Sequence, residues 1–388
     1  MGSVFHERKR LNDYELSAFA KGSLSILVEL RWIARCRTVL TEPQVRIINF
    51  SNHSIDGGVM AKYDVYGIGN ALVDMEYEVE AADLEALGLD KGVMTLVDEE
   101  QQLKMMAHLA AHPHQRSSGG SAANSMIAVS QFGGASFYSC KVAGDDLGYF
   151  YMKDLLEGGV DTNHHTEKEM GHTGRCVVLV TPDSDRTLCT FLGISGGLSS
   201  KELVEEALRD SAYFYMEGYL VTSDTARQAC IEAKRIAEGS GVKTAISLSD
   251  PNMVRFFKTG LLEMIGSGVD LLFANEDEAR GMAGAVDLNG TVDYLKRVSR
   301  EFVMTRGSQG ALIWDGQTLI DIDPVKVQAV DTVGAGDMFA GAFLYGRGQG
   351  WEHRRAGDLA SAASAKLVTS LGPRISAAET QAILRSFL

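Results

Sequence analysis

Short apolar runs alternate with longer amphipathic segments along most of this chain. Apolar runs of this length predict buried strands, and intervening segments such as 224–238 predict helices. The expected strands are residues 63–69, 135–142, 213–217, 243–248 and 271–274. Strands that alternate with helices predict an α/β fold, with a mostly parallel sheet and helices on both faces.

Other short segments predict smaller features. Residues 75–80, 92–97, 174–181 and 186–193 favour a second, small sheet, in which the last two segments pair around the turn at 181–185. Residues 310–314 and 317–322 flank Asp315-Gly316, a pair typical of a hairpin turn. Two helices are expected near the end, at 354–367 and 377–387.

The composition fits a globular chain with an acidic surface. The 388 residues are 45% hydrophobic and 23% charged, and the net charge is −14. An acidic protein repels nucleic acid and anionic membranes, so we expect neither as a partner. No apolar run approaches the roughly 18 residues of a membrane span. The five cysteines are widely spaced without a C-x-x-C pair, which favours a reducing compartment and a cytoplasmic location.

Residues 1–61 differ from the rest and are expected to lie outside the fold. Up to residue 60 there are eight basic and six acidic residues, so this part carries 8 − 6 = +2 of the net −14 and leaves −16 for the remainder. Residues 24–40 could form a short helix, but the segment lacks the pattern of a signal peptide. Because the first predicted strand begins at Tyr63, we hypothesise that Met60 is the native start. The mature N-terminus, read by mass spectrometry, tests this.

Residues 330–341 (VDTVGAGDMFAG) hold the strongest candidate chemistry. An extended apolar segment, 325–330, runs into Gly334-Ala335-Gly336, and a helix follows. Glycines and a helix N-terminus together make a site for a phosphoryl group. Asp337 in the first helical turn is placed to take a proton from an attacking hydroxyl, which is what phosphoryl transfer to an alcohol requires. The alternative is a glycine turn that caps a core helix, with Asp337 stabilising the helix dipole.

A second stretch, residues 118–124 (SGGSAAN), leads into another predicted helix. Gly119 and Gly120 could form a hinge and Asn124 could face a polyol, or Ser121 could simply cap the helix. Asp74 follows the first strand, where a carboxylate can accept hydrogen bonds from vicinal hydroxyls, although an ordinary loop aspartate is equally compatible. That strand ends in Gly-x-Gly, but Leu72 stands where a dinucleotide fingerprint needs a third glycine.

Residues 275–279 (NEDEA) open a helix whose composition has two explanations. Asn275 can cap it, and the acidic residues favour the positive end of the helix dipole. Alternatively, Glu278 could act on Mg²⁺ through water, because Mg²⁺ keeps several waters beside one or two carboxylates and phosphate oxygens. Further along, 303–310 (VMTRGSQG) is a strand followed by a glycine turn, in which Arg306 could contact phosphates or remain an exposed surface arginine.

These stretches together resemble the PfkB (ribokinase-like) family of carbohydrate and nucleoside kinases. The pattern D-T-V-G-A-G-D-x-F-x-G at 331–341 is similar to the C-terminal signature of that family. The G-G-x-x-x-N spacing at 119–124 is similar to the N-terminal signature, and Gly144-Asp145-Asp146-Leu147-Gly148 also follows the family pattern. The resemblance covers residues 62–388 and implies a ribokinase-like α/β domain with a four-stranded lid.

The resemblance also implies an ATP-dependent transfer to a primary hydroxyl of a sugar or nucleoside. Asp337 would be the base, and Gly334, Ala335 and Gly336 would stabilise the transferred group. The nucleotide side would comprise Asn275, Glu278 (through Mg²⁺), Thr305, Arg306, Gly307, Ser308, Gly310 and Gly336. The acceptor side would comprise Asp74, Gly119, Gly120, Asn124, Asp337 and, with less support, Glu217. A K⁺ site would use Asp331, Val333 and the loop 371–374, where Gly372-Pro373 replaces the more usual Gly-Ala.

The acceptor is less determined than the reaction. Ser121 and Ala122 stand where ribokinases usually have Lys and Gly, so the chain looks more like the bacterial adenosine-kinase-like branch. Three aromatic residues could stack on a base or pack in the core: Phe137, Tyr138 and Phe191. A sugar phosphate would need a basic cluster, for which Lys141, Arg175 and Arg186 are available. We therefore expect a nucleoside acceptor, with a free sugar or a non-catalytic ligand-binding regulator as alternatives, and a monomer or a dimer formed through the lid.

Overall fold

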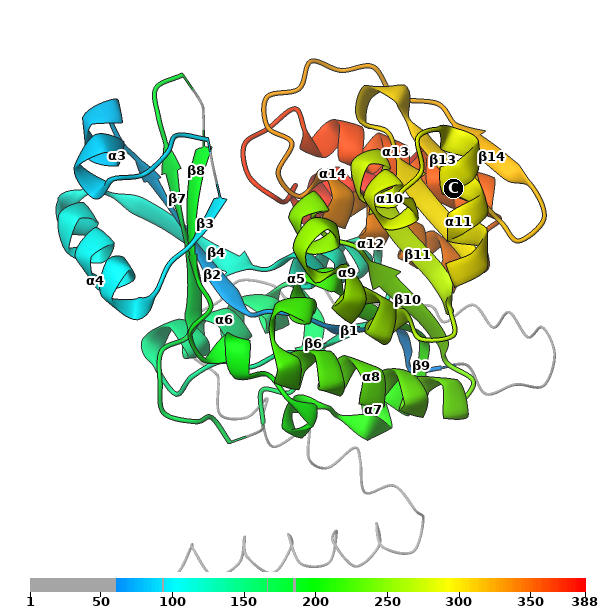
Figure 1. Ribbon diagram of the computed structural model, residues 1–388, viewed down its shortest axis with the longest axis horizontal. Coiled ribbons are helices and arrows are strands. Elements are labelled where there is room, and N and C mark those ends of the chain that lie inside the picture. Colours follow the sequence, from blue (N-terminus) through cyan, green and yellow to red (C-terminus); the bar gives the residue numbers. More distant parts are fainter. Residues whose placement is uncertain (1–60, 93, 166, 184–185) are drawn as a thin grey trace, which may run out of the picture. The chain divides into compact units, whose positions relative to one another are not determined.

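A nine-stranded sheet carries the core of the protein in the computed structural model, which describes residues 61–92, 94–165, 167–183 and 186–388 (Figure 1). In spatial order its strands are β14 (Leu319–Ile322), β13 (Ala311–Trp314), β12 (Ser299–Thr305), β11 (Val269–Asn275), β10 (Lys243–Ser247), β9 (Ser211–Glu217), β1 (Tyr63–Ile68), β5 (Ser136–Ser139) and β6 (Val160–Thr162). The strands from β12 to β6 are parallel, and β13 and β14 add an antiparallel hairpin at one edge. The α/β fold and the hairpin are thus confirmed.

Helices cover both faces of this sheet, so that one hydrophobic layer lies on each face. One layer holds α5 (Ser121–Phe132), α6 (Asp146–Glu157), α12 (Ala335–Gly348), α13 (His353–Leu367) and α14 (Ala377–Arg385). The other holds α7 (Glu205–Arg209), α8 (Asp224–Gly239), α9 (Pro251–Ile265), α10 (Glu276–Ala283) and α11 (Leu288–Val298). With side chains packed on both faces, the parallel strands bury nearly every residue, which explains their continuous apolar sequences.

The second sheet, which we call the lid, has five strands, so the expectation of four was wrong. In spatial order they are β3 (Met94–Leu96), β8 (Arg186–Phe191), β7 (Gly174–Val180), β2 (Leu72–Glu78) and β4 (His114–Gly119). The four predicted segments are all present, and α3 (Ala81–Leu87) and α4 (Glu99–His108) belong to the same part of the chain (Figure 1). The missed strand, β4, contains serines and glycine, which favour strands weakly. Its pairing with β2 decides its conformation.

The apolar segment 325–330 is irregular and leaves Val325 and Val330 about half exposed, at 48% and 54%. One further local expectation was wrong. Gly120, rather than Ser121, is the residue before α5, and the hydroxyl of Ser121 is used elsewhere.

All described residues belong to one compact unit, Met60–Leu388. The predicted N-terminal extension and its helix at 24–40 lie outside the described residues, so the division at residues 61 and 62 stays a prediction. Within the described part, no helix is both long and apolar enough to cross a membrane.

Candidate functional site

The order of the strands places a crevice beside β1. The chain runs from β1 outward to β5 and β6, then returns to build β9 to β12 on the other side, so the connections diverge at the carboxyl ends of β1 and β9. Such a switch point is where parallel sheets bind ligands. Asn70, just after β1, donates its backbone and side-chain N–H groups to Glu217 Oε1 at the end of β9 (3.2 and 3.1 Å). Glu217 therefore links the carboxyl ends of β1 and β9 at the bottom of the crevice.

A cavity of about 520 Å³ opens above this floor, between the lid and the carboxyl ends of the central strands. Of the predicted site residues, it brings together Asp74, Gly120, Asn124, Glu217, Asn275, Glu278, Thr305, Val333, Gly334, Gly336 and Asp337. Residues of both predicted ends, acceptor and nucleotide, thus share one space although 263 positions separate Asp74 from Asp337 in the chain (337 − 74).

Asp337 lies in the first turn of α12 and is held by two donors from α5. Ser121 Oγ donates to its Oδ1 (2.5 Å), and Asn124 Nδ2 donates to its Oδ2 (3.1 Å). Burial raises the pKa of Asp337 to about 6, against the opposing effect of these two donors and of Arg374. A base whose pKa lies just below neutrality is ionised at pH 7 and still basic enough to accept a proton in a transition state.

The start of α12 has the geometry expected of the predicted anion site. Gly334 precedes the helix with φ +77°, a left-handed conformation, and a Cβ there would lie 2.6 Å from the carbonyl oxygen of Pro373. Gly336 and Asp337 also line the cavity, so the first turn of the helix faces it. The N–H groups of a first turn have no acceptors within their helix and carry the positive end of its dipole. The turn can therefore bind a phosphoryl group beside the base.

The diglycine is required by close contacts on the acceptor side. A Cβ on Gly119 would lie 2.3 Å from the carboxyl oxygens of Asp74, and a Cβ on Gly120, at φ +99°, would lie 2.3 Å from the carbonyl oxygen of Asn70. Burial raises the pKa of Asp74 to about 7, and the nearby Asp337 carboxylate adds to the effect. Asp74 thus faces the cavity from β2, directly beside the glycines.

At the other end of the cavity, Asn275 and Glu278 form a reciprocal capping pair. Asn275 donates its backbone N–H to Glu278 Oε2 (2.9 Å) and its Nδ2 to Oε1 (2.7 Å), and Glu278 N–H donates to Asn275 Oδ1 (2.8 Å). Glu278 still lines the cavity, and burial raises its pKa to about 7, together with the carboxylates of Asp250, Asp277 and Asp337. Both explanations offered for these residues are therefore compatible with the geometry.

The glycine turn after β12 lies away from this space. Thr305 lines the cavity, but Arg306, Gly307, Ser308 and Gly310 do not. Arg306 pairs instead with Asp321 of the edge hairpin. An arginine held in this way is oriented by the hairpin and not by the cavity.

Asp331, the candidate for K⁺, already has several partners. Its Oδ1 accepts the N–H of Val333 (3.0 Å) and its Oδ2 accepts the N–H of Gly372 (2.8 Å). Arg186 Nη1 from the lid lies 3.4 Å from the same Oδ2. The carboxylate thereby ties together the loop before α12, the loop before α14 and the lid.

Sequence reasoning missed several residues at the site. Asn70, Tyr219 and Asp250 line the cavity, and Arg374 contacts Asn124 beside it. The position of Asn70 directly after a strand-ending Gly-x-Gly was an available signal. For Arg374 the sequence indicated only membership of the loop 371–374, and its contact with Asn124 depends on how that loop folds back against α5.

The ionisable side chains that line the cavity are mostly carboxylates. Within the described residues its lining contains five carboxylates and neither lysine nor arginine; the acidic residues are Asp74, Glu217, Asp250, Glu278 and Asp337. Such a lining repels a polyanion that arrives alone. A triphosphate with a bound Mg²⁺, whose phosphates meet the N-terminus of α12, fits this environment.

The face that the lid turns toward the cavity is mostly apolar. Strand register aligns Asp74 with Cys176, Cys176 with Thr190, and Thr190 with Leu96, so these side chains share one face of the lid. Beyond Asp74, we call the residues of this face that line the cavity the lid wall: Leu72, Met94, Leu96, Cys176, Leu188 and Thr190. The lid therefore offers a single carboxylate next to the diglycine and a broad aliphatic surface beyond it.

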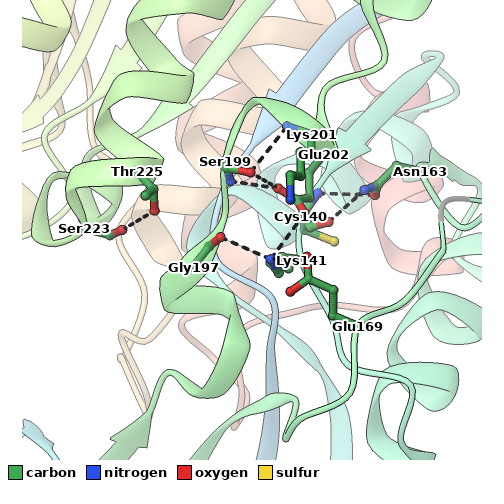
Figure 2. A network of polar contacts seen from close by, with 10 residues as sticks. All are labelled: Cys140, Lys141, Asn163, Glu169, Gly197, Ser199, Lys201, Glu202, Ser223 and Thr225. Carbon is green, nitrogen blue, oxygen red and sulfur yellow. Dashed lines mark hydrogen bonds and ion pairs between the residues drawn. The ribbon is translucent and has the colours of Figure 1, made fainter.

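Among the described residues, none of the basic ones considered for a sugar phosphate lies in the cavity, and two of them have partners elsewhere. Figure 2 shows the Lys141 ammonium group between Glu169 and Glu202, at 3.1 and 3.6 Å, where it also donates to the carbonyl of Gly197 (3.3 Å). Arg186 pairs with Glu76 and Asp331. In the part of the chain that the structure describes, neither these two residues nor Arg175 lines the cavity.

Comparisons with known proteins agree with this geometry. Residues 82–381 match the model of the pfkB family carbohydrate kinases. A solved structure of adenosine kinase from Sinorhizobium meliloti is 32% identical with a TM-score of 0.76, covering 84% of this chain and 99% of its own. A probable sugar kinase from Rhizobium etli is 29% identical with a TM-score of 0.77, covering 85% and 100%. Adenosine kinase from Dictyostelium discoideum is 25% identical over 345 residues, which are 82% of this chain and 98% of that protein.

Proposed function

The chain belongs to the pfkB family of carbohydrate kinases and is a phosphotransferase that acts on a hydroxyl group, and from this premise we propose that its acceptor is a nucleoside, with adenosine the expected substrate. The observation that supports a nucleoside is the lid itself. Asp74 can accept hydrogen bonds from sugar hydroxyls, and the adjoining lid wall can cover a flat, poorly solvated base. A free sugar has hydroxyls on all sides and would leave this aliphatic surface without a partner.

The candidate residues suggest how the reaction proceeds. Asp337 Oδ2 would accept the proton of the primary hydroxyl as the oxygen attacks the γ-phosphoryl group of ATP. Asn124 and Ser121 hold the carboxylate in place during this step. The first turn of α12, from Gly334 to Gly336, would stabilise charge on the transferred group. Glu278 would bind water molecules of a Mg²⁺ ion, which neutralises phosphate charge when it is present.

An assay of ADP release with Mg-ATP tests the acceptor. The panel comprises adenosine, other nucleosides, ribose, fructose and sugar phosphates. We expect turnover with adenosine and none with sugar phosphates, because the lining is acidic. Faster turnover with a free sugar would agree with phosphotransferase activity and would contradict the proposal of a nucleoside acceptor. Absence of turnover across the panel would favour the non-catalytic regulator instead.

K⁺, oligomeric state and location complete the proposal. A K⁺ ion at Asp331 and Val333 would share the carboxylate with Arg186, so comparing KCl with an organic cation salt tests it directly. We propose a monomer or a dimer through the lid, to be distinguished by light scattering. A cytoplasmic location is supported by the four described cysteines, all buried free thiols.

Truncating the lid wall should affect nucleosides selectively. We expect Leu188→Ser to raise the KM for adenosine about tenfold, because loss of apolar contact in a pocket typically costs 10–200-fold in discrimination. Leu103→Ser is the control, since Leu103 is a leucine of α4 that lies outside the cavity and is 57% exposed. Equal KM values for Leu188→Ser and the wild type would show that the base does not lie on this wall.

The rate should also depend on pH in a defined way. Because the pKa of Asp337 is raised to about 6, the reactive carboxylate is present above that pH and is lost as the pH falls through it. We expect kcat to fall about tenfold per pH unit well below 6. The measurement is kcat at saturating Mg-ATP and acceptor from pH 4.5 to 8. A flat profile across this range would contradict the assignment of the base.

A further inference from the structure

We propose that Arg374 is a positioning residue for the reaction: it fixes the side-chain amide of Asn124 in the one orientation that supports Asp337. This inference rests on the proposed role of Asp337 as the base. It is carried by the contacts of Arg374 and by the donor and acceptor chemistry of the groups involved.

Arg374 lies in the loop before α14 and donates to three separate elements. Its Nε donates to Asn124 Oδ1 on α5 (2.9 Å), its Nη2 to Ser118 Oγ on β4 (3.1 Å), and its Nη1 to Asp154 Oδ2 on α6 (3.3 Å). Asp154 Oδ2 in turn accepts the backbone N–H of Ser118 (3.0 Å). The guanidinium group thus contacts Ser118, just before the diglycine, and the side-chain amide of Asn124, shortly after it.

The chemistry of these partners allows only one arrangement of the amide. A guanidinium group has donors and no acceptor, so it must face the oxygen of Asn124. The Nδ2 group then points to Asp337, whose carboxylate accepts hydrogen bonds when ionised. Without Arg374, a single hydrogen bond to Asp337 is all that orients the amide, and the side chain can move away from the carboxylate. Arg374 therefore acts on the base through Asn124.

A lysine cannot replace this group. Three donors in a fixed planar fork reach three elements at once, whereas an ammonium group is a single point on a flexible stem. Against the effect of burial, the positive charge also lowers the pKa of Asp74 and of Asp337, but charge alone does not orient an amide. The position of the fork decides where the amide lies.

The same loop connects to the anion site. Pro373 packs against Gly334, and Gly372 N–H donates to Asp331. Arg374 follows these two residues directly, so the backbone that shapes the start of α12 also delivers the guanidinium group to Asn124. The anion site and the orientation of the base are thereby set by neighbouring residues of one loop.

A double-mutant cycle tests the inference. We expect Arg374→Met to lower kcat about 10²-fold, the effect of a misplacement near 1 Å, with little change in the KM for ATP. Asn124→Ala should cost a similar factor, and the double variant should be no slower than the slower single variant, because both changes remove one linkage. Arg374→Lys should recover only part of the rate.

Controls separate this role from general stability. Arg347→Met removes an equally buried arginine, at 15% side-chain exposure against 19%, whose contacts with Glu301 and Trp351 lie away from the cavity. It should lower the melting temperature and leave kcat unchanged. If Arg374→Met does not fold, the cycle is run with Arg374→Lys.

Three outcomes would overturn the inference. They are multiplicative effects of the two substitutions, an unchanged kcat in Arg374→Met, and an equal loss of kcat in Arg347→Met. A separate result would contradict the underlying proposal that Asp337 is the base: full activity of the Asp337→Asn variant. An inactive Asp337→Asn together with a fully active Arg374→Met would remove only the role of Arg374.

Discussion

Asp337→Asn is expected to lower kcat by about 10²–10⁴-fold, the usual contribution of a positioned base. The substitution keeps the size of the side chain and removes its ability to accept a proton. It also leaves one acceptor oxygen for two donors, since Ser121 and Asn124 each bind a different carboxylate oxygen. The measurement is kcat with the best acceptor, beside ATP binding by calorimetry, which we expect to remain.

Asp64→Asn is the matched control for this variant. Asp64 is an aspartate on β1 whose pKa is also raised by burial, and its Oδ2 accepts the N–H of Ala135 at the opposite end of the sheet from the cavity. Asp64→Asn should change stability and leave kcat near the wild-type value. Turnover of Asp337→Asn close to that of the wild type would exclude Asp337 as the base.

The fold was largely predictable because its signals are local. Parallel strands covered on both faces need continuous apolar residues, so β1, β9, β10 and β11 were located from sequence alone. The strand β4 was not, because serine and glycine acquire strand geometry only by pairing with β2.

The candidate site divides in the same way. Asp337, Gly334 and the diglycine could be recognised because a glycine in a strained position or beside a carboxylate leaves a trace in the sequence. Arg374 and the lid wall could not, since both depend on contacts across the fold. Leu72, Leu188 and Leu96 look like ordinary strand residues, and only the register of the lid shows that they share a face with Asp74.

The same difference between local and tertiary signals applies to the aromatic residues that were candidates for binding the acceptor. Phe137, Tyr138 and Phe191 were candidates for stacking on a base because of their side chains alone. In the structure the ring of Phe137 stacks on that of Tyr66, with 5.1 Å between the ring centroids. The hydroxyl of Tyr138 donates to the backbone carbonyl of Asn70 (3.0 Å). Phe191 is also absent from the cavity lining within the described residues. None of these three residues is therefore placed to stack on a base in the cavity, and the surface proposed for a base is the lid wall.

Gly334→Ala is the second substitution with a large expected effect. A Cβ at this residue would meet backbone and side-chain atoms of Pro373 at 2.6–2.9 Å, so either the loop or the first turn of α12 must move. Movement of that turn displaces the N–H groups that would bind the transferred phosphoryl group. Loss of one such donor typically costs about 10²–10³-fold in kcat, and we expect a loss of that size.

Gly350→Ala separates the backbone cost from the loss of the site. Gly350 has nearly the same conformation, φ +74° against +77°, but a Cβ there would meet nothing within 4 Å. Both variants should lose about 1–3 kcal/mol of stability, the cost of a left-handed conformation in a residue with a side chain. Only Gly334→Ala should have a lower kcat. The measurements are kcat at saturating substrates and thermal unfolding of both variants. Equal kcat values in the two variants would place the phosphoryl group somewhere other than the start of α12, and the contact of Pro373 with Gly334 would then have no part in the reaction.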